Sequence, residues 1–164
     1  MNESSRSWQG SAEAPNTDET WSRLAPSAID SVARYDACRL EIERARVAPG
    51  IREKITDPVY SVRNLFSSWE HLVRRMESDW QLPGQYPISA YTNDLDARDQ
   101  LQIAMGTLTE EAQAELSILL AALDARFVRE SVLDEVGELR PWLKPSSGEE
   151  PHGFWLRKPR DHPW

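Results

Sequence analysis

Residues 57–80, DPVYSVRNLFSSWEHLVRRMESDW, decide the fold that this sequence predicts. Their apolar side chains recur at alternating steps of three and four residues, at Val59, Val62, Phe66, Trp69, Val73, Met76 and Trp80. This spacing places them on one stripe of a helix that faces a core. Asp57 suits the N-cap and Pro58 the first helical position, while Leu82-Pro83-Gly84 suits the end. The sequence therefore predicts one long helix over this stretch.

Three further helices are expected, over about residues 27–47, 94–105 and 109–133. Each shows apolar residues at helical spacing, and Ser27 and Thr109 are good N-caps for the first and the last of them. No run of alternating apolar and polar residues is long enough to build a sheet. The sequence therefore predicts an all-α, four-helix bundle-like single domain.

The two ends of the chain are expected to differ from this helical domain, which is assigned to residues 26–137. Residues 1–25 are rich in Ser, Asn, Glu and small residues, so a flexible N-terminal tail is expected. Residues 138–164 are rich in proline and tryptophan. This composition predicts an irregular, non-helical segment that packs on the domain as a strap, with at most a short extended piece over residues 154–157.

The chain of 164 residues carries 27 acidic and 19 basic side chains, which gives a formal net charge of −8. This balance argues against nucleic acid or an anionic membrane as the main partner, and it is compatible with a basic protein partner. Cys38 is the single cysteine, so no internal disulfide is expected, which fits a reducing cytoplasm. Because no segment resembles a signal peptide or a membrane span, we expect a soluble cytoplasmic protein.

The sequence contains no recognisable catalytic constellation, so no catalytic residue and no cofactor is predicted. Its glycines form no phosphate-binding loop, and no serine lies in a nucleophile elbow. His71, His152 and His162 lack the spacing of a zinc site. Cys38 lies in the middle of a predicted helix on a partly apolar face, which predicts a buried structural thiol. An enzyme is therefore the less favoured class of protein.

The acidic residues Asp96, Asp99, Glu111 and Glu115 belong to the one grouping in the sequence that suits a hard cation. Spacings of three and four residues put the members of each pair on one helix face. Helical metalloproteins build cation sites from such carboxylates. Capping and the helix dipole explain acids near helix starts equally well. The grouping keeps open, as an alternative, a helical metal-dependent hydrolase of a nucleotide or phosphoester.

The candidate partner-binding residues lie in the C-terminal segment: Trp142, Trp155, Arg157 and Trp164. Trp and Arg are the residue types that most often carry interface energy, although the same aromatic side chains can instead close a gap between helices. Residues 106–136 hold seven acidic and two basic residues. The outer face of the last predicted helix is therefore expected to be the most negative surface of the molecule.

These features favour a non-enzymatic protein-binding module, of adaptor, antitoxin or immunity type. It is expected to act through the acidic helical surface and the aromatic C-terminal segment. A second alternative is a self-assembling structural protein, in which this segment and the acidic helix meet between copies. Under this alternative the protein would be a homo-oligomer, so a homo-oligomeric state also remains an open alternative.

Residues 93–128, from Asn93 to Val128, resemble a region of small proteins from high-GC Gram-positive bacteria. In both, a helix that ends in an Asp-Ala-Arg element is followed by a segment rich in Trp, Pro and Arg. The resemblance implies a bacterial protein, and it implies no activity and no site residue.

Overall fold

The computed structural model describes residues 17–78, 86–143, 153–161 and 164, and within them the chain is mostly helical. The α-helices are α1 Thr17–Arg23, α2 Pro26–Ala45, α3 Pro49–Arg52, α4 Val62–Glu77, α5 Ile88–Met105 and α6 Glu110–Arg129. The C-terminal part adds the strands β1 Ser131–Leu133 and β2 Arg157–Pro159, and the 3-10 helices η1 Arg140–Trp142 and η2 Gly153–Leu156. The predicted all-α fold class is confirmed.

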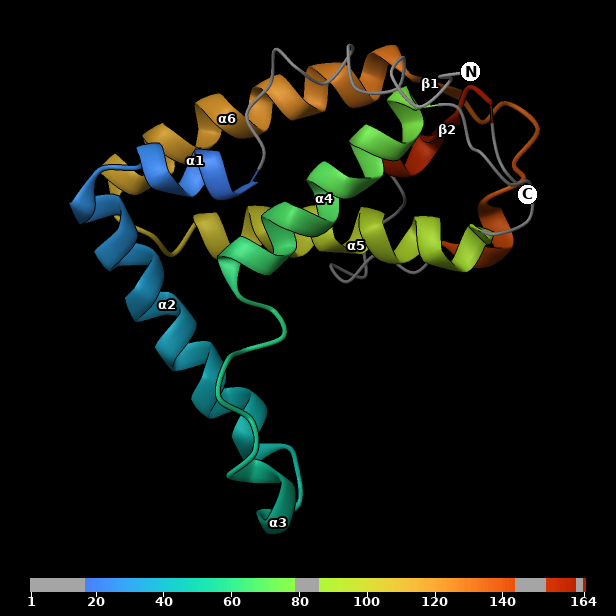
Figure 1. The fold of residues 1–164 in the computed structure, drawn as a ribbon. Helices are drawn as coiled ribbons and strands as arrows, with labels where there is room; N and C mark the ends of the chain where they lie inside the picture. Colours follow the sequence, from blue (N-terminus) through green and yellow to red (C-terminus); the bar gives the residue numbers. More distant parts are fainter. Residues whose placement is uncertain (1–16, 79–85, 144–152, 162–163) are drawn as a thin grey trace, which may run out of the picture.

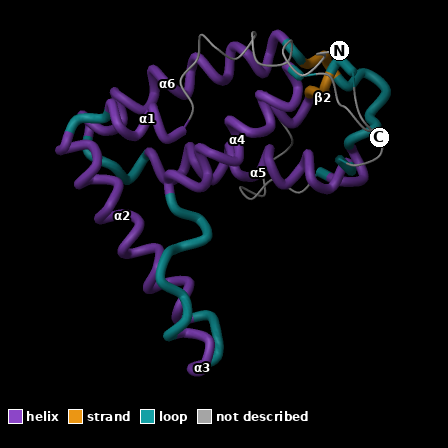
Figure 2. Tube along the Cα trace, in the orientation of Figure 1, coloured by secondary structure: helices purple, strands orange, loops and turns teal. Residues whose placement is uncertain are grey.

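Helices α4, α5 and α6 form the body of the molecule, with α4 crossing between the other two (Figure 1). Helix α2 begins beside the start of α6 and projects away from this body, so that α3 lies at its far tip (Figure 1). The two short strands lie together at the end where α6 stops (Figure 2). The core therefore sits between α4, α5 and α6 rather than at the centre of four parallel helices.

Helix α4 carries the predicted apolar stripe, but it begins at Val62 rather than at Pro58. Ser61 is the N-cap, and its side chain accepts a hydrogen bond from the amide of Asn64 at 3.1 Å. The amide of Val62 donates to a carboxylate oxygen of Asp36 in α2 at 2.9 Å, which fixes the start of the helix. Val59 is consequently outside the helix and 68% exposed, and Trp80 lies outside the described residues.

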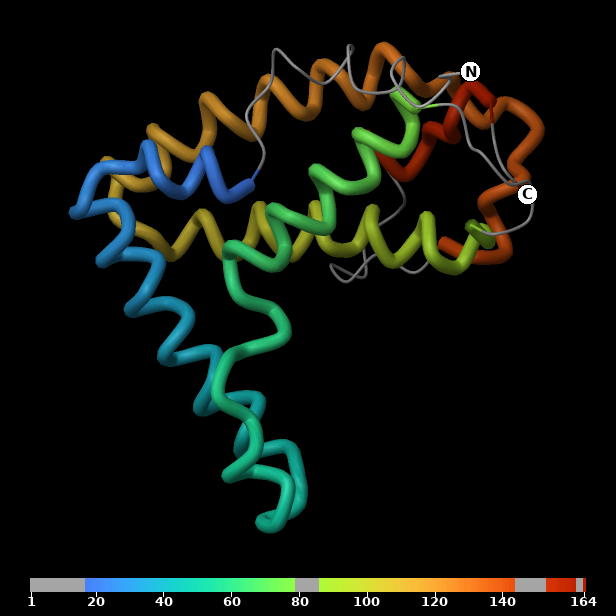
Figure 3. The backbone as a smooth tube through the Cα atoms, in the orientation of Figure 1, coloured from blue at the N-terminus to red at the C-terminus, as the bar shows by residue number. Residues whose placement is uncertain are grey.

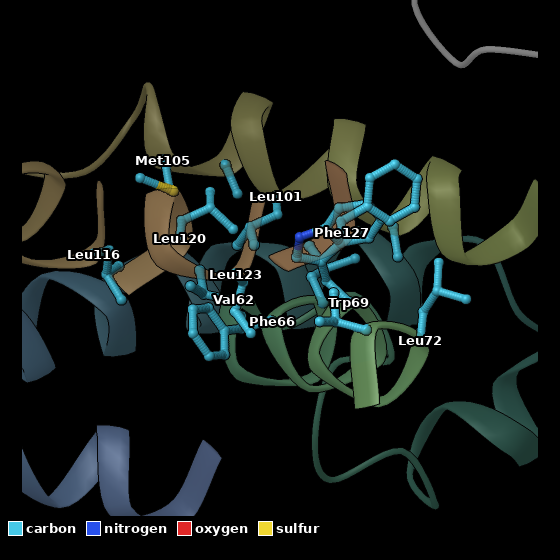
Figure 4. Close-up of a cluster of buried hydrophobic side chains, with 14 of the residues drawn as sticks. Val62, Phe66, Trp69, Leu72, Leu101, Met105, Leu116, Leu120, Leu123 and Phe127 are labelled. Atoms are coloured by element: carbon cyan, nitrogen blue, oxygen red, sulfur yellow. The ribbon is translucent and has the colours of Figure 1, made fainter. Parts of the chain in front are cut away.

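The centre of the core is Trp69, whose side chain is fully buried. Its ring lies 4.7 Å from the ring of Phe127 in α6, centroid to centroid. The indole N–H donates to Asp124 Oδ1 at 2.9 Å. Arg98 in α5 donates to the two oxygens of the same carboxylate, at 3.0 and 2.8 Å. Figure 4 shows Trp69 in the cluster of buried side chains that also includes Leu101 of α5 and Phe127 of α6. The Asp124 carboxylate thus joins three helices.

A flexible tail was expected over residues 1–25. This prediction is wrong for the last residues of the range, because Thr17–Arg23 forms α1. This helix packs on α4: the rings of Trp21 and Phe66 meet edge to face at 5.6 Å. The amide of Thr17 donates to the buried carboxylate of Glu70 at 2.8 Å. The partners that order α1 are distant in sequence, which explains why local composition did not reveal it. Residues 1–16 lie outside the described residues.

The C-terminal segment packs on the body, as expected for a strap, but it is more regular than predicted. It contains the two 3-10 helices, and β2 pairs antiparallel with β1, with Ser131 opposite Pro159. The predicted extended piece lies slightly later than residues 154–157. Figure 3 shows the segment returning to the end of the body where α6 stops. Leu139 and Trp155 are both buried, which anchors it there.

Among the described residues, every helix is too short or too polar to span a lipid bilayer.

We expect that Asp124→Ala lowers the free energy of unfolding by about 2–3 kcal/mol, because the buried Arg98 guanidinium and Trp69 N–H both lose their acceptor. Urea denaturation measures the change. Glu135→Ala removes an exposed carboxylate from the same end of the chain and is the matched control, with an expected change below about 0.5 kcal/mol. Equal losses in the two variants would contradict a structural role for the Asp124 carboxylate.

Candidate functional site

A cavity of about 370 Å³ lies where the C-terminal segment meets the first turns of α5. Seven residues from three elements line it: Ser89, Thr92, Asn93, Asp96, Pro141, Trp142 and Trp155. Two of them are partner-binding candidates from the sequence, and one is a cation candidate. We name this cavity the Trp142 pocket.

One wall of the Trp142 pocket is a single face of α5. Residues 89, 92, 93 and 96 follow helical spacing, so their polar side chains lie on one side. From the sequence this helix was expected to begin at about residue 94, which would have left residues 89, 92 and 93 outside it, but α5 begins at Ile88. The backbone carbonyl of Pro87 accepts from the amides of Ala90 at 2.9 Å and Tyr91 at 3.2 Å, which starts the helix early. The earlier start is what builds this wall.

The opposite wall is η1, and a tight turn holds it in place. The Asp134 carboxylate accepts from the amides of Glu138 at 3.0 Å and Leu139 at 2.9 Å. Gly137 lies inside this turn with a φ of +73°, a conformation that side chains other than glycine rarely adopt. Leu139 is fully buried and anchors the turn in the core. Trp142, three residues later, is left 47% exposed at the pocket.

The indole of Trp155 forms the inner end of the pocket and is only 2% exposed. Its N–H donates to Asp99 Oδ2 in α5 at 2.6 Å. In the same turn of α5 as Ser89 and Thr92, the Tyr91 hydroxyl donates to the carbonyl oxygen of Arg157 at 2.6 Å. These two hydrogen bonds tie the C-terminal segment to α5, so the pocket has fixed walls on both sides.

The chemistry of the pocket is aromatic, hydroxyl-rich and acidic. Of the described residues that line it, Asp96 alone carries a formal charge. Trp142 offers a partly exposed indole, the aromatic ring that attracts cations best. A carboxylate beside an indole suits an ammonium or guanidinium group, and the pocket contains hydroxyl and amide groups that can hydrogen-bond such a group.

The structure brings two of the four partner-binding candidates into the pocket, Trp142 and Trp155. Of these, only Trp142 has substantial surface for a partner. Arg157 is used internally, since its guanidinium donates to Ser131 Oγ at 2.8 Å and to the Val128 carbonyl at 3.2 Å. The ring of Trp164 packs on Tyr91, 5.6 Å away between centroids. Arg157 and Trp164 therefore contribute contacts that hold the C-terminal segment on the body.

The four cation candidates do not meet at one place. Asp96 lines the pocket, and Asp99 accepts from Trp155. Glu115 accepts from the amide of Ala25 at 2.9 Å, and Glu111 is exposed in the first turn of α6. Within the part of the chain that the structure describes, no group of three or more His, Cys, Asp or Glu side chains could hold a metal ion.

Two other residues considered in the sequence, Cys38 and His71, also lie outside the pocket. Cys38 is exposed, so the prediction of a buried structural thiol is wrong. His71 is exposed on α4, and His152 and His162 lie outside the described residues.

The expected acidic outer face of α6 is also wrong over the middle of that helix. Its exposed residues between Glu111 and Arg129 are all uncharged: Ala114, Ser117, Ile118, Ala121, Ala122, Ala125 and Val128. The acids of this stretch, Glu115 and Asp124, are turned toward Ala25 and toward Trp69. The count of acidic residues was right, but their partners inside the fold remove them from the surface.

A second, wider groove of about 520 Å³ lies between α2 and the turn that joins α5 to α6. Its lining is mostly apolar, with Cys38 at its edge and Arg34 as its one charged side chain among the described residues. It contains no partner-binding candidate from the sequence. The Trp142 pocket is therefore the candidate site.

Comparisons with known protein families, with curated proteins and with solved structures found no match to this chain.

Asp94 lies on α5 next to the pocket wall, but its side chain faces the other way, toward Tyr86. Burial raises the pKa of the Asp94 carboxyl above its usual range; the Tyr86 hydroxyl, which donates to it, and the cations Arg75 and His71 act against this rise. Burial and the Asp94 carboxylate likewise raise the pKa of Tyr86. The surroundings of Asp94 in the fold therefore favour the protonated carboxyl more than water does.

We expect the stability difference between Asp94→Asn and the unmodified protein to depend on pH. A raised folded-state pKa means that the folded protein binds the proton more tightly than the unfolded chain, so its stability falls as pH rises from the unfolded pKa through the folded one. The asparagine variant lacks this loss. Its free energy of unfolding relative to the unmodified protein should rise as the pH increases above about 4, the pKa of the carboxyl in the unfolded chain, measured by urea denaturation. Parallel pH profiles would contradict the raised pKa.

Proposed function

We propose that this protein is a non-enzymatic protein-binding module that receives a basic side chain of its partner in the Trp142 pocket. The observation that carries the proposal is the half-exposed indole of Trp142 facing a wall whose one charged side chain is Asp96. Trp142 is a partner-binding candidate from the sequence, and Asp96, which lines the same pocket, contributes an acidic side chain. The partner is therefore expected to present lysine or arginine.

The dimensions of the pocket support one side chain rather than a whole cofactor. At about 370 Å³ the cavity is at the small end of the range of ligand sites. An ammonium or guanidinium group over an indole contributes about 0.5–2 kcal/mol, depending on how far it is desolvated. A single pocket of this kind gives specificity, and the rest of the affinity has to come from surrounding surface.

The charge of the whole chain supports the same class of partner. A net charge of −8 attracts a basic partner over a distance and speeds its association at low ionic strength. We further propose that the protein acts in the cytoplasm, because its single cysteine is an exposed free thiol, which a reducing compartment preserves.

The hydrolase alternative receives less support from the structure. Three of its four carboxylates already serve separate purposes: Asp99 holds Trp155, Glu115 holds Ala25, and Asp96 lines the pocket. A protein-binding module, by contrast, needs no rearrangement of the Trp142 pocket.

The proposal is tested with three synthetic nine-residue peptides of Gly and Ser that differ only at the central residue, which is Arg, Lys or Gln. Binding is followed by NMR through the indole N–H signals, of which the Trp142 signal is identified by its loss in Trp142→Ala. The Arg and Lys peptides should shift the Trp142 signal and the Gln peptide should not. A shift with a neutral sugar but not with the basic peptides would contradict the proposal.

Variants locate the binding in the pocket. Asp96→Asn should weaken binding of the Arg peptide about tenfold, and added salt should reduce that difference, because the variant removes a charge that salt screens. Ile103→Ala changes a residue of the same helix that is 55% exposed and does not line the pocket, so it is the matched control. Equal binding by Asp96→Asn and the control would contradict the assigned role of the carboxylate.

A further inference from the structure

The proposed function makes no use of the groove of about 520 Å³ between α2 and the turn that joins α5 to α6. One of its walls is a single face of α2, where Ser31, Arg34, Tyr35 and Cys38 follow helical spacing. The other wall is the turn itself, residues 107–109. We name this cavity the α2 groove.

The two walls of the α2 groove are joined by a hydrogen bond. The amide of Thr109 donates to Ser31 Oγ at 3.0 Å. The hydroxyl of Thr107 donates to the carbonyl oxygen of Ala104 at 2.8 Å, which ties the turn to the end of α5. Ser31 is 4% exposed and Leu108 is 6% exposed, so they form the floor. The groove is therefore a built feature of the fold.

The α2 wall carries hydrogen-bond donors that have no acceptor in the fold. Ser31 Oγ accepts from Thr109, but its own O–H proton finds no acceptor among the described residues. Arg34 forms no hydrogen bond or ion pair within the described ranges, although Asp30 precedes it by one turn of α2. The Tyr35 hydroxyl also makes no hydrogen bond to a described residue. These donors suit a ligand that supplies acceptor atoms.

The charge and the apolar surface of the groove narrow the class of ligand. None of the described residues that line it is acidic, so the charge of Arg34 is uncompensated there. A carboxylate only accepts hydrogen bonds and matches the geometry of a guanidinium group. The rest of the lining is mostly apolar, with the ring of Tyr35 and the side chain of Leu108 beside the cation. This combination suits a carboxylate on an apolar body.

We propose that the α2 groove binds a small organic acid. Its carboxylate pairs with Arg34 and accepts from the Ser31 hydroxyl, and its apolar body lies along Tyr35 and Leu108. The volume of the groove lies within the range of small-molecule sites. A free acid is favoured over a protein segment because the Ser31 donor lies at a buried floor, which a compact group reaches more easily. The ligand is opposite in charge to the basic group proposed for the Trp142 pocket, so the two proposals are independent.

The acidic net charge of the chain does not prevent this binding. Glu110 and Glu111 follow Thr109 in the chain, but neither lines the groove. Interactions between exposed charges are largely screened beyond about 10 Å at 0.1 M salt. A carboxylate paired with Arg34 acts at hydrogen-bond distance instead. The α2 groove is therefore a local cationic site on an acidic protein.

The first test uses Cys38, the single cysteine of the chain, as a reporter, because it lines the groove. The rate at which iodoacetamide alkylates Cys38 is measured by intact mass in the presence of octanoate, octanamide or octylammonium. Octanoate should slow the reaction at least about fivefold with a saturable dependence on concentration. Octanamide should protect less, and octylammonium should not protect. Free N-acetylcysteine controls for effects on the reagent. Equal protection by the three compounds, or none by octanoate at about 10 mM, overturns the proposal.

The second test assigns the carboxylate to Arg34 by calorimetric titration. Arg34→Gln should weaken octanoate binding about tenfold and leave octanamide binding unchanged, because only octanoate carries the charge. Arg46→Gln removes the same charge from an exposed position about three turns further along the chain, which does not line the groove, and is the matched control. Both positions are exposed, so the thermal midpoint should change little. Equal octanoate binding by the two variants overturns the assigned role of Arg34.

The third test fills the groove. Cys38→Phe should abolish octanoate binding, whereas Ala37→Phe adds the same side chain at the next exposed position, outside the groove, and should not. Both variants should still bind the Arg peptide at the Trp142 pocket, so failure of one proposal is distinguishable from failure of the other. Octanoate binding that survives Cys38→Phe overturns the proposed location. Tighter binding of acetyl-Leu-Glu-Leu-amide than of octanoate would assign the groove to a protein segment and overturn the proposed ligand class.

Discussion

The carboxylate of Asp124 is the contact on which the architecture depends. It accepts from the indole of Trp69 and from two N–H groups on one edge of the Arg98 guanidinium, so α4, α5 and α6 meet at one side chain. Each donor is buried and would lose its acceptor if the carboxylate moved. Apolar packing supplies most of the stabilisation, as in other small domains, but it is non-directional. The hydrogen bonds of Asp124 set the relative positions of the three helices.

The C-terminal segment depends on this body and in return creates the candidate site. Phe154 packs on Trp69 and Phe127, with ring centroids 5.3 Å from each, and the guanidinium of Arg98 lies over its ring. Trp155 is tied to Asp99, and η1 is held by the turn at Asp134. Trp142 is thereby brought to the first turns of α5 although the two are about fifty residues apart in the chain. The Trp142 pocket therefore exists only when the segment is docked.

The Trp142 pocket and the outward side of α6 owe their character to different physical causes. The Trp142 pocket combines aromatic and acidic groups at a point where two elements meet, and it suits a cation. The outward side of α6 carries few charges between Glu111 and Arg129 because Glu115 and Arg126 are used for contacts within the fold.

The sequence by itself determined the helical class, the buried stripe of α4 and the N-cap at Thr109, because helical period and capping act within a few residues of the chain. Only the tertiary structure decided where α4 and α5 begin, that α1 forms, and which charged residues of α6 remain at the surface. Asp36 fixes the start of α4, Glu70 orders α1, and Ala25 withdraws Glu115. These partners lie tens of residues away from the groups they bind, so no local pattern could reveal them. The candidate site likewise depends on both levels. Trp142 was recognisable in the sequence from its residue type, but the residues around it are determined by the docking of the C-terminal segment on α5.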